Sequence, residues 1–226
     1  MTPTESAAAK PPLITPTFVL AWVANFCQFL VFYLFVTTMA LYAVESFGAS
    51  DTVGGFASSA FVLGATCMRV FSGWIVDRVG HKKAALASLA FVTLVAVAYF
   101  FAHNVAVLII VRMVHGAAYA LTSTALMAVA QSVIPHERRA EGTGYFALGT
   151  TLATAFGPAI GLLLANNIGY TTLFAVALGA NIVSLILALV LRYPAEVSSE
   201  KPAFKLRNAV HPNVVPIGLF LSLIHI

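Results

Sequence analysis

The chain has 226 residues, of which 60% are hydrophobic and 9% are charged, and its formal net charge is +4 at pH 7. Its mean hydropathy is +0.94. Soluble domains carry about 25% charged residues, so this composition excludes a soluble globular protein and indicates a membrane protein. The two cysteines lie inside apolar stretches, which argues against a disulfide framework, and no spacing of ligand-type residues indicates a metal site.

Residues 1–17 contain one lysine and several helix breakers, and we expect a disordered cytoplasmic tail there. Six apolar runs follow, each near the length of about 20 residues that crosses a bilayer. They cover residues 18–44, 52–76, 84–102, 105–133, 142–165 and 171–191. The first is too long for a signal-peptide core, and the alternating segments of a β-barrel do not occur. The predicted fold class is an all-α membrane protein with a six-helix transmembrane bundle over residues 18–192.

The polar residues 193–213 are expected to form a flexible cytoplasmic linker. Residues 214–226 begin another apolar run, which as a helix would span about 20 Å, short of the roughly 30 Å bilayer core. We expect this run to be the truncated start of a seventh transmembrane helix, so that the chain is the N-terminal portion of a larger protein. A short re-entrant segment or a natural end is the alternative.

Outside the apolar runs, lysine and arginine occur on alternate connections. The basic residues follow the second, fourth and sixth runs, for example at Lys83, Arg139 and Arg192, whereas the other three connections contain none. The positive-inside rule then places both chain ends in the cytoplasm, in a multi-pass protein of the inner or plasma membrane. Because these charges are dispersed and no binding motif accompanies them, a nucleic-acid partner is not expected.

The connection after the second run reads GWIVDRVGHKK. Gly73 precedes Asp77 by four residues, so both share one helix face on which another helix can approach closely. Asp77 lies at the cytoplasmic helix end, where a carboxylate can face the positive N-terminus of a neighbouring helix. Gly80 can adopt a positive φ and turn the chain sharply.

Four segments in chain order resemble motifs of the major facilitator superfamily. The loop is similar to G-x-L-A-D-R-x-G-R-K through Gly73, Asp77, Arg78, Gly80 and Lys82. The stretch RMVHGAAYA is similar to R-x-x-Q-G through Arg112 and Gly116, and IPHERRAEG to P-x-E-R-R. The stretch GTTLATAFGPAIG is similar to the antiporter-associated motif G-x(7)-GP-x-x-G through Gly149, Gly157, Pro158 and Gly161. The resemblance implies the N-terminal half of a twelve-helix transporter, with the loop residues acting in conformational gating.

Two positions depart from the family pattern. His81 and Ser132 stand where the family tends to have an arginine and an aspartate that pair. Both charges are missing together, so a full charge relay on this loop is not expected.

Arg112 lies about seven residues into the fourth run, roughly 10 Å deep. A charge at that depth costs several kcal/mol in lipid, so we expect it to face the bundle interior or a wet cavity. The predicted substrate pathway unites this face of the fourth run with a similar face of the first: Asn25, Gln28, Phe32, Tyr33, Arg112, His115 and Tyr119. The alternative is ordinary hydrogen bonding between helices, worth about 0.6 kcal/mol per contact. Arg69 is expected to snorkel to the cytoplasmic boundary as an anchor.

In the fifth run, Gly149, Ala153, Gly157 and Gly161 are spaced by four and predict a ridge for close helix packing. Pro158 cannot donate to the carbonyl of Thr154 and is expected to kink this helix. A kinked helix with a smooth ridge could rock against its neighbour, or the ridge could serve tight packing without motion.

The resemblance implies a secondary active transporter that works by alternating access, with efflux by proton antiport preferred over a uniporter or symporter for a sugar or metabolite. The expected partners are the lipid bilayer, a small-molecule substrate and the missing C-terminal half. No cofactor is expected, and the proton gradient is the expected energy source.

Acidic residues lie only at the ends of the runs or outside them. A proton-coupling carboxylate would therefore belong to the missing half, or His115 would replace it, or proton coupling is absent. A non-transporting scaffold or receptor is a remote alternative. No catalytic residue is proposed, because an intramembrane enzyme would need a set such as H-E-x-x-H, which the sequence lacks.

Overall fold

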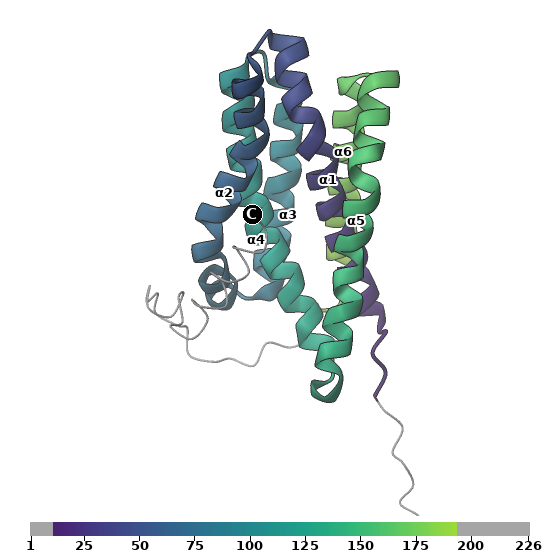
Figure 1. The fold of residues 1–226 in the computed structure, drawn as a ribbon. Helices are drawn as coiled ribbons and strands as arrows, with labels where there is room; N and C mark the ends of the chain where they lie inside the picture. Colours follow the sequence, from purple (N-terminus) through teal and green to yellow (C-terminus); the bar gives the residue numbers. More distant parts are fainter. Residues whose placement is uncertain (1–10, 194–226) are drawn as a thin grey trace, which may run out of the picture.

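The computed structural model describes residues 11–193, which form six long helices and two short 3-10 turns (Figure 1). They are α1 (Pro16–Phe47), α2 (Asp51–Val79), α3 (His81–Ala98), η1 (Tyr99–Phe101), α4 (Val105–Val133), η2 (His136–Arg138), α5 (Arg139–Asn167) and α6 (Tyr170–Val190). Six helices are long and apolar enough to cross a membrane, and the described residues contain no strand. The prediction of an all-α bundle of six transmembrane helices is confirmed.

Most helices extend a few residues beyond the predicted apolar runs, because polar residues cap them. Thr15, Ser50 and Asn104 are the N-caps of α1, α2 and α4, and each side chain accepts a hydrogen bond from a backbone N–H. Pro16 occupies the first turn of α1, where its missing N–H removes no helical hydrogen bond. Because these end residues are polar, a prediction from hydropathy alone does not include them in the helices.

The described part of the predicted tail is ordered. Leu13 is buried in one apolar cluster with Ile134 and Phe146, and α1 already begins at Pro16, so the prediction of disorder is wrong for residues 11–17. Residues 1–10, the rest of the linker and the predicted start of a seventh helix lie outside the described residues.

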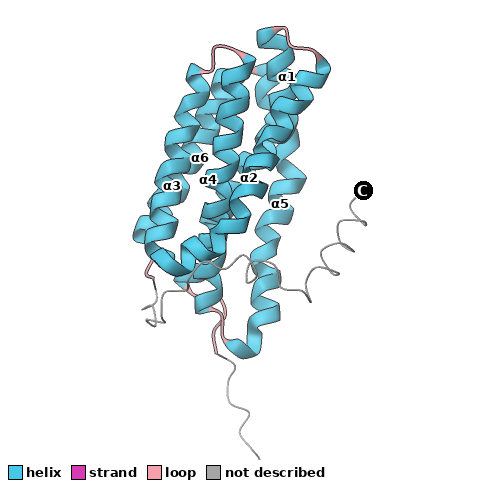
Figure 2. Cartoon of the chain, turned by 90° about the vertical axis from the view of Figure 1, so that its left-hand side faces the viewer, coloured by secondary structure: helices cyan, strands magenta, loops and turns pink. Residues whose placement is uncertain are grey.

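The six helices pack around α1 and α4. Helix α2 lies against α4, and α5 lies against α1. Helices α3 and α6 contact each other and pack on α4 and α1 respectively. Figure 2 shows α3 and α6 on one side of the bundle, with α2 and α5 toward the other. This arrangement leaves α2 and α5 with broad exposed surfaces.

Candidate functional site

Arg112 on α4 is completely buried, with 0% of its surface exposed. Its Nε donates to the carbonyl oxygen of Ala57 at 3.3 Å, and its Nη2 donates to that of Ser58 at 2.8 Å. Its guanidinium carbon lies 4.8 Å from the centre of the Phe61 ring, a cation–π contact. All three contacts are with α2. Arg112 therefore joins the two helices.

Two glycines allow α2 and α4 to approach closely beside this arginine. A Cβ placed on Gly116 would lie 1.9 Å from the carbonyl oxygen of Phe61. A Cβ placed on Gly64 would lie 1.9 Å from the carbonyl oxygen of Met113. Both distances are far below any real contact, so only glycine fits at either position. Gly116 and Arg112, four residues apart on one face of α4, together hold α2 in place.

His115 is also buried, and its Nδ1 lies 2.9 Å from the hydroxyl of Tyr99. Within the described residues, Nη1 of Arg112 has no hydrogen-bond partner. The guanidinium of Arg112 lies in the bundle interior, against α2 and the ring of Phe61. Its role in a substrate pathway stays a prediction.

The polar residues of α1 are buried as well. Asn25 is buried, and Gln28 donates from Nε2 to Oδ1 of Asn181 on α6 at 3.0 Å. One turn further along α6, the hydroxyl of Ser184 donates to the carbonyl oxygen of Ala24 at 2.9 Å. Gln28 thus joins α1 to α6, and its place in the substrate pathway stays a prediction.

The aromatic members of the predicted pathway form one cluster. Phe32 and Tyr33 on α1 are half-buried, whereas Tyr119 on α4 is buried beneath them. The ring centre of Phe32 lies 4.8 Å from that of Tyr33 and 5.8 Å from that of Tyr119. Phe29 extends the cluster, with its ring centre 5.6 Å from that of Tyr119. We call Phe29, Phe32, Tyr33 and Tyr119 the aromatic wall.

The predicted gating loop has the turn that the sequence indicated. Gly80 ends α2 with φ of 93°, which confirms the expected positive φ. The Lys82 ammonium lies 5.8 Å from the ring centre of Tyr193, and burial raises the pKa of this tyrosine to about 12. The Arg78 guanidinium lies 5.4 Å from the Trp74 ring centre.

The partner expected for Asp77 belongs to the missing half, so the helix contact predicted at Gly73 and Asp77 stays a prediction. Asp77 is exposed, and nothing lies within 4 Å of a Cβ placed on Gly73. These two residues of α2 thus present an open surface at this end of the bundle.

The glycine ridge of α5 packs on α1 as predicted. A Cβ on Gly157 would lie 2.5 Å from the Cβ of Tyr33, and one on Gly161 would lie 2.6 Å from the carbonyl oxygen of Leu34. Gly149 faces the indole of Trp22. Helix α5 continues through Pro158 without interruption. The ridge confirms close packing, and whether it also permits motion stays a prediction.

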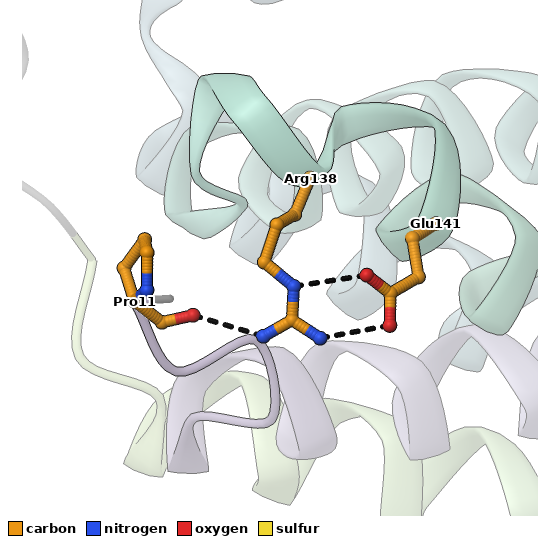
Figure 3. Close-up of polar contacts among 3 residues, drawn as sticks. All are labelled: Pro11, Arg138 and Glu141. Atoms are coloured by element: carbon orange, nitrogen blue, oxygen red, sulfur yellow. Dashed lines mark hydrogen bonds and ion pairs between the residues drawn. The ribbon is translucent and has the colours of Figure 1, made fainter. Parts of the chain in front are cut away.

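One ion pair was missed from the sequence. Arg138 donates from Nε and Nη2 to the two carboxylate oxygens of Glu141 at 2.9 and 2.7 Å, and from Nη1 to the carbonyl oxygen of Pro11 at 2.9 Å (Figure 3). The spacing of three residues in the ERRAE stretch was its only sequence signal. This contact attaches the N-terminal segment to the α4–α5 corner.

Comparisons with known proteins agree with the motifs. The family model of the Major Facilitator Superfamily matches residues 21–225. An uncharacterized protein of Mycobacterium tuberculosis, Rv2265, is 35% identical over 124 residues, which is 54% of this chain and 29% of the relative. The staphylopine export protein of Staphylococcus aureus is 31% identical over 133 residues, 58% of this chain and 32% of the relative.

The multi-drug resistance efflux pump PmrA of Streptococcus pneumoniae is 29% identical over 161 residues, 69% of this chain and 39% of the pump. The chain therefore aligns with about a third of the length of each of these relatives. The family match extends over most of the chain, and the structure has the six membrane-spanning helices expected of half such a fold. The chain belongs to the major facilitator superfamily.

Proposed function

We propose that this chain is the N-terminal bundle of a secondary active transporter that exports a small molecule by alternating access. The family match over residues 21–225 carries the proposal. Two relatives are named as exporters, of staphylopine in one case and of multiple drugs in the other, which favours efflux as the direction. The substrate of this chain is not inferred from those names.

The exposed surfaces of α5 support a second bundle. One face is apolar and exposed through Leu148, Leu152 and Phe156, as lipid contact requires. Another carries the exposed hydroxyl-bearing residues Thr151 and Thr154. Both hydroxyls donate to a carbonyl oxygen one turn back on α5, so what each has left to offer a protein or water-lined surface is its acceptor lone pairs. A C-terminal bundle facing α2 and α5 would provide this surface.

Within this proposal, α2 and α4 move as one body. Arg112 joins them by its hydrogen bonds to the carbonyl oxygens of α2, and Gly116 lets the two backbones approach closely. The open surface at Gly73 and Asp77 is where the second bundle would meet α2 and gate the pathway. The ridge with Gly157 is where α5 would shift against α1.

The orientation is proposed from charge. Basic residues gather at the end of the bundle that carries the α2–α3 and α4–α5 connections and the residues after α6. The opposite connections, residues 48–50, 102–104 and 168–169, contain neither lysine nor arginine. The positive-inside rule makes the basic end cytoplasmic, which places the N-terminus inside the cell in its plasma or inner membrane.

Proton antiport is the proposed energy source. In the described helices, acidic side chains lie at the ends: Glu45, Asp51, Asp77 and Glu141. The coupling carboxylate would therefore lie in the second bundle. This same observation is the reason to retain uniport or symport of a sugar or metabolite as a second candidate.

The test is transport by the purified intact protein in lipid vesicles. An imposed proton gradient, inside acidic, should drive accumulation of substrate in vesicles whose transporters expose their cytoplasmic face, and a protonophore should abolish it. Movement that ignores the gradient would indicate a uniporter. If no solute from a broad panel moves, a non-transporting receptor or scaffold becomes the better assignment.

A further inference from the structure

Arg69 is an exposed cation within the membrane-spanning part of α2. It precedes the last residue of the helix, Val79, by ten positions, which is about 15 Å along the axis. Side chains on a helix point back toward its N-terminus. A guanidinium that keeps this direction lies toward the middle of the membrane, whereas the predicted anchoring would turn it toward the cytoplasmic end.

The packing beside Arg69 supports a position near Tyr119. Met68, the residue before Arg69, packs against the cluster that contains Phe61 and Tyr119. Tyr119 also interacts electrostatically with both Arg69 and Tyr33. Tyr119 is the middle residue of α4 (Val105–Val133), so the three groups meet near mid-membrane. They come from three helices, α1, α2 and α4.

No hydrogen bond or ion pair satisfies the Arg69 side chain within residues 11–193. The acidic residue that follows it on α2, Asp77, lies eight positions later, about 12 Å along the axis. An exposed guanidinium at membrane depth with no counter-charge is costly, so it favours an anion beside it.

The aromatic wall provides an apolar surface next to this charge. Phe29, Phe32 and Tyr33 are half-buried, so each ring leaves part of its surface on α1 exposed to a ligand. Their rings pack on Tyr119 and on one another, with the ring centres of Phe32 and Phe61 4.9 Å apart, so the surface is held rigidly. A flat apolar ligand can stack there.

We propose that the exported solute is an amphipathic organic anion, whose carboxylate or similar group pairs with Arg69 while its apolar part packs on the aromatic wall. This substrate class rests on the proposed export function. The guanidinium offers two parallel N–H donors to one carboxylate, which Lys could match in charge but not in geometry.

The test compares an organic anion with an organic cation. The intact transporter is reconstituted in vesicles, and movement of fluorescein and of ethidium is followed for the wild type, Arg69→Gln, Arg69→Lys and Arg69→Glu. Arg192→Gln is the matched control, since Arg192 is an exposed arginine at the cytoplasmic end of the same bundle. Binding of 1-naphthoate to the purified proteins, followed by tryptophan fluorescence, is the second measurement.

Fluorescein should move and ethidium should not in the wild type and in Arg192→Gln. Arg69→Gln should slow fluorescein and weaken naphthoate binding by about 10- to 100-fold, the effect of losing one hydrogen bond to a charged group. Arg69→Lys should retain part of the fluorescein movement and part of the naphthoate affinity. Arg69→Glu should make the transporter prefer ethidium to fluorescein.

Preference of the wild type for ethidium, or equal fluorescein movement in wild type and Arg69→Gln, would overturn the anion assignment and leave export intact. Equal loss of both dyes' movement in Arg69→Gln would show that Arg69 supports transport without choosing the charge of the solute, which also overturns the assignment. If neither dye moves, the naphthoate titration alone decides Arg69, and the export proposal is decided by the broad solute panel described above. Weaker naphthoate binding by Arg69→Gln than by the wild type supports the site. Equal binding by the two proteins, or no binding by the wild type, overturns it.

Discussion

Replacing Gly64 by alanine should separate α2 from α4 at their closest approach. The added Cβ would lie 1.9 Å from the carbonyl oxygen of Met113. An ordinary carbon–oxygen contact is about 3.3 Å, so the two helices would have to part by about 1.4 Å. The obstacle is backbone on both sides, so no side-chain rotation relieves it.

The cost has two parts. Overpacking of this kind typically costs about 1–3 kcal/mol. Separation of the helices would also stretch the 2.8 Å hydrogen bond from Arg112 to the Ser58 carbonyl, and a hydrogen bond to a charged group is worth about 1.5–3 kcal/mol. Together the two parts cost about 2.5–6 kcal/mol. For a domain of this size each kcal/mol lowers Tm by about 2–4 °C, so we expect a fall of about 5–24 °C.

The assay is thermal unfolding of the purified protein in detergent, read by the monodisperse fraction on size exclusion after heating. Gly55→Ala is the matched control on the same helix, because nothing lies within 4 Å of a Cβ at that position. It should leave Tm unchanged or raise it slightly, since alanine favours a helix over glycine by up to about 1 kcal/mol. Equal Tm values for Gly64→Ala and Gly55→Ala would refute the close approach of α2 and α4.

Three further outcomes are expected. Arg112→Ala should reduce the transport rate at least about tenfold, because two hydrogen bonds that join α4 to α2 are lost. Immunoblots should show near-normal expression. Undiminished transport would show that transport does not need these hydrogen bonds. Asp77→Asn should slow turnover several-fold with little change in substrate Kd, and a changed Kd with normal turnover would contradict a gating role. In a cysteine-free background, Ser50→Cys should react with an impermeant maleimide in whole cells and Lys83→Cys should not; the reverse pattern would invert the proposed orientation.

The helix count and the sharp turn at Gly80 could be predicted because each depends on local sequence. An apolar run of sufficient length must become a helix in lipid, where every backbone group needs an internal partner. A glycine that ends such a helix before a basic segment needs only its own backbone freedom. Neither inference requires knowledge of which helices are neighbours.

The contacts of Arg112 and Gln28 could not be predicted for the opposite reason. Arg112 binds backbone carbonyls of α2, and every residue of the chain has a carbonyl. Gln28 lies on a helix that packs against several others, so its face could meet a pathway or α6, and periodicity does not distinguish the two.

The buried amide pair between Gln28 and Asn181 restricts how α1 and α6 can slide along each other. Apolar helices in lipid gain little by choosing one vertical alignment over another, since each offset buries similar surface. A single donor and acceptor 3.0 Å apart make one offset better than its neighbours, as a lone polar residue does in a coiled coil. Homologous chains should therefore change these two positions jointly, and a sequence family in which they vary independently would show that the offset is fixed by other means.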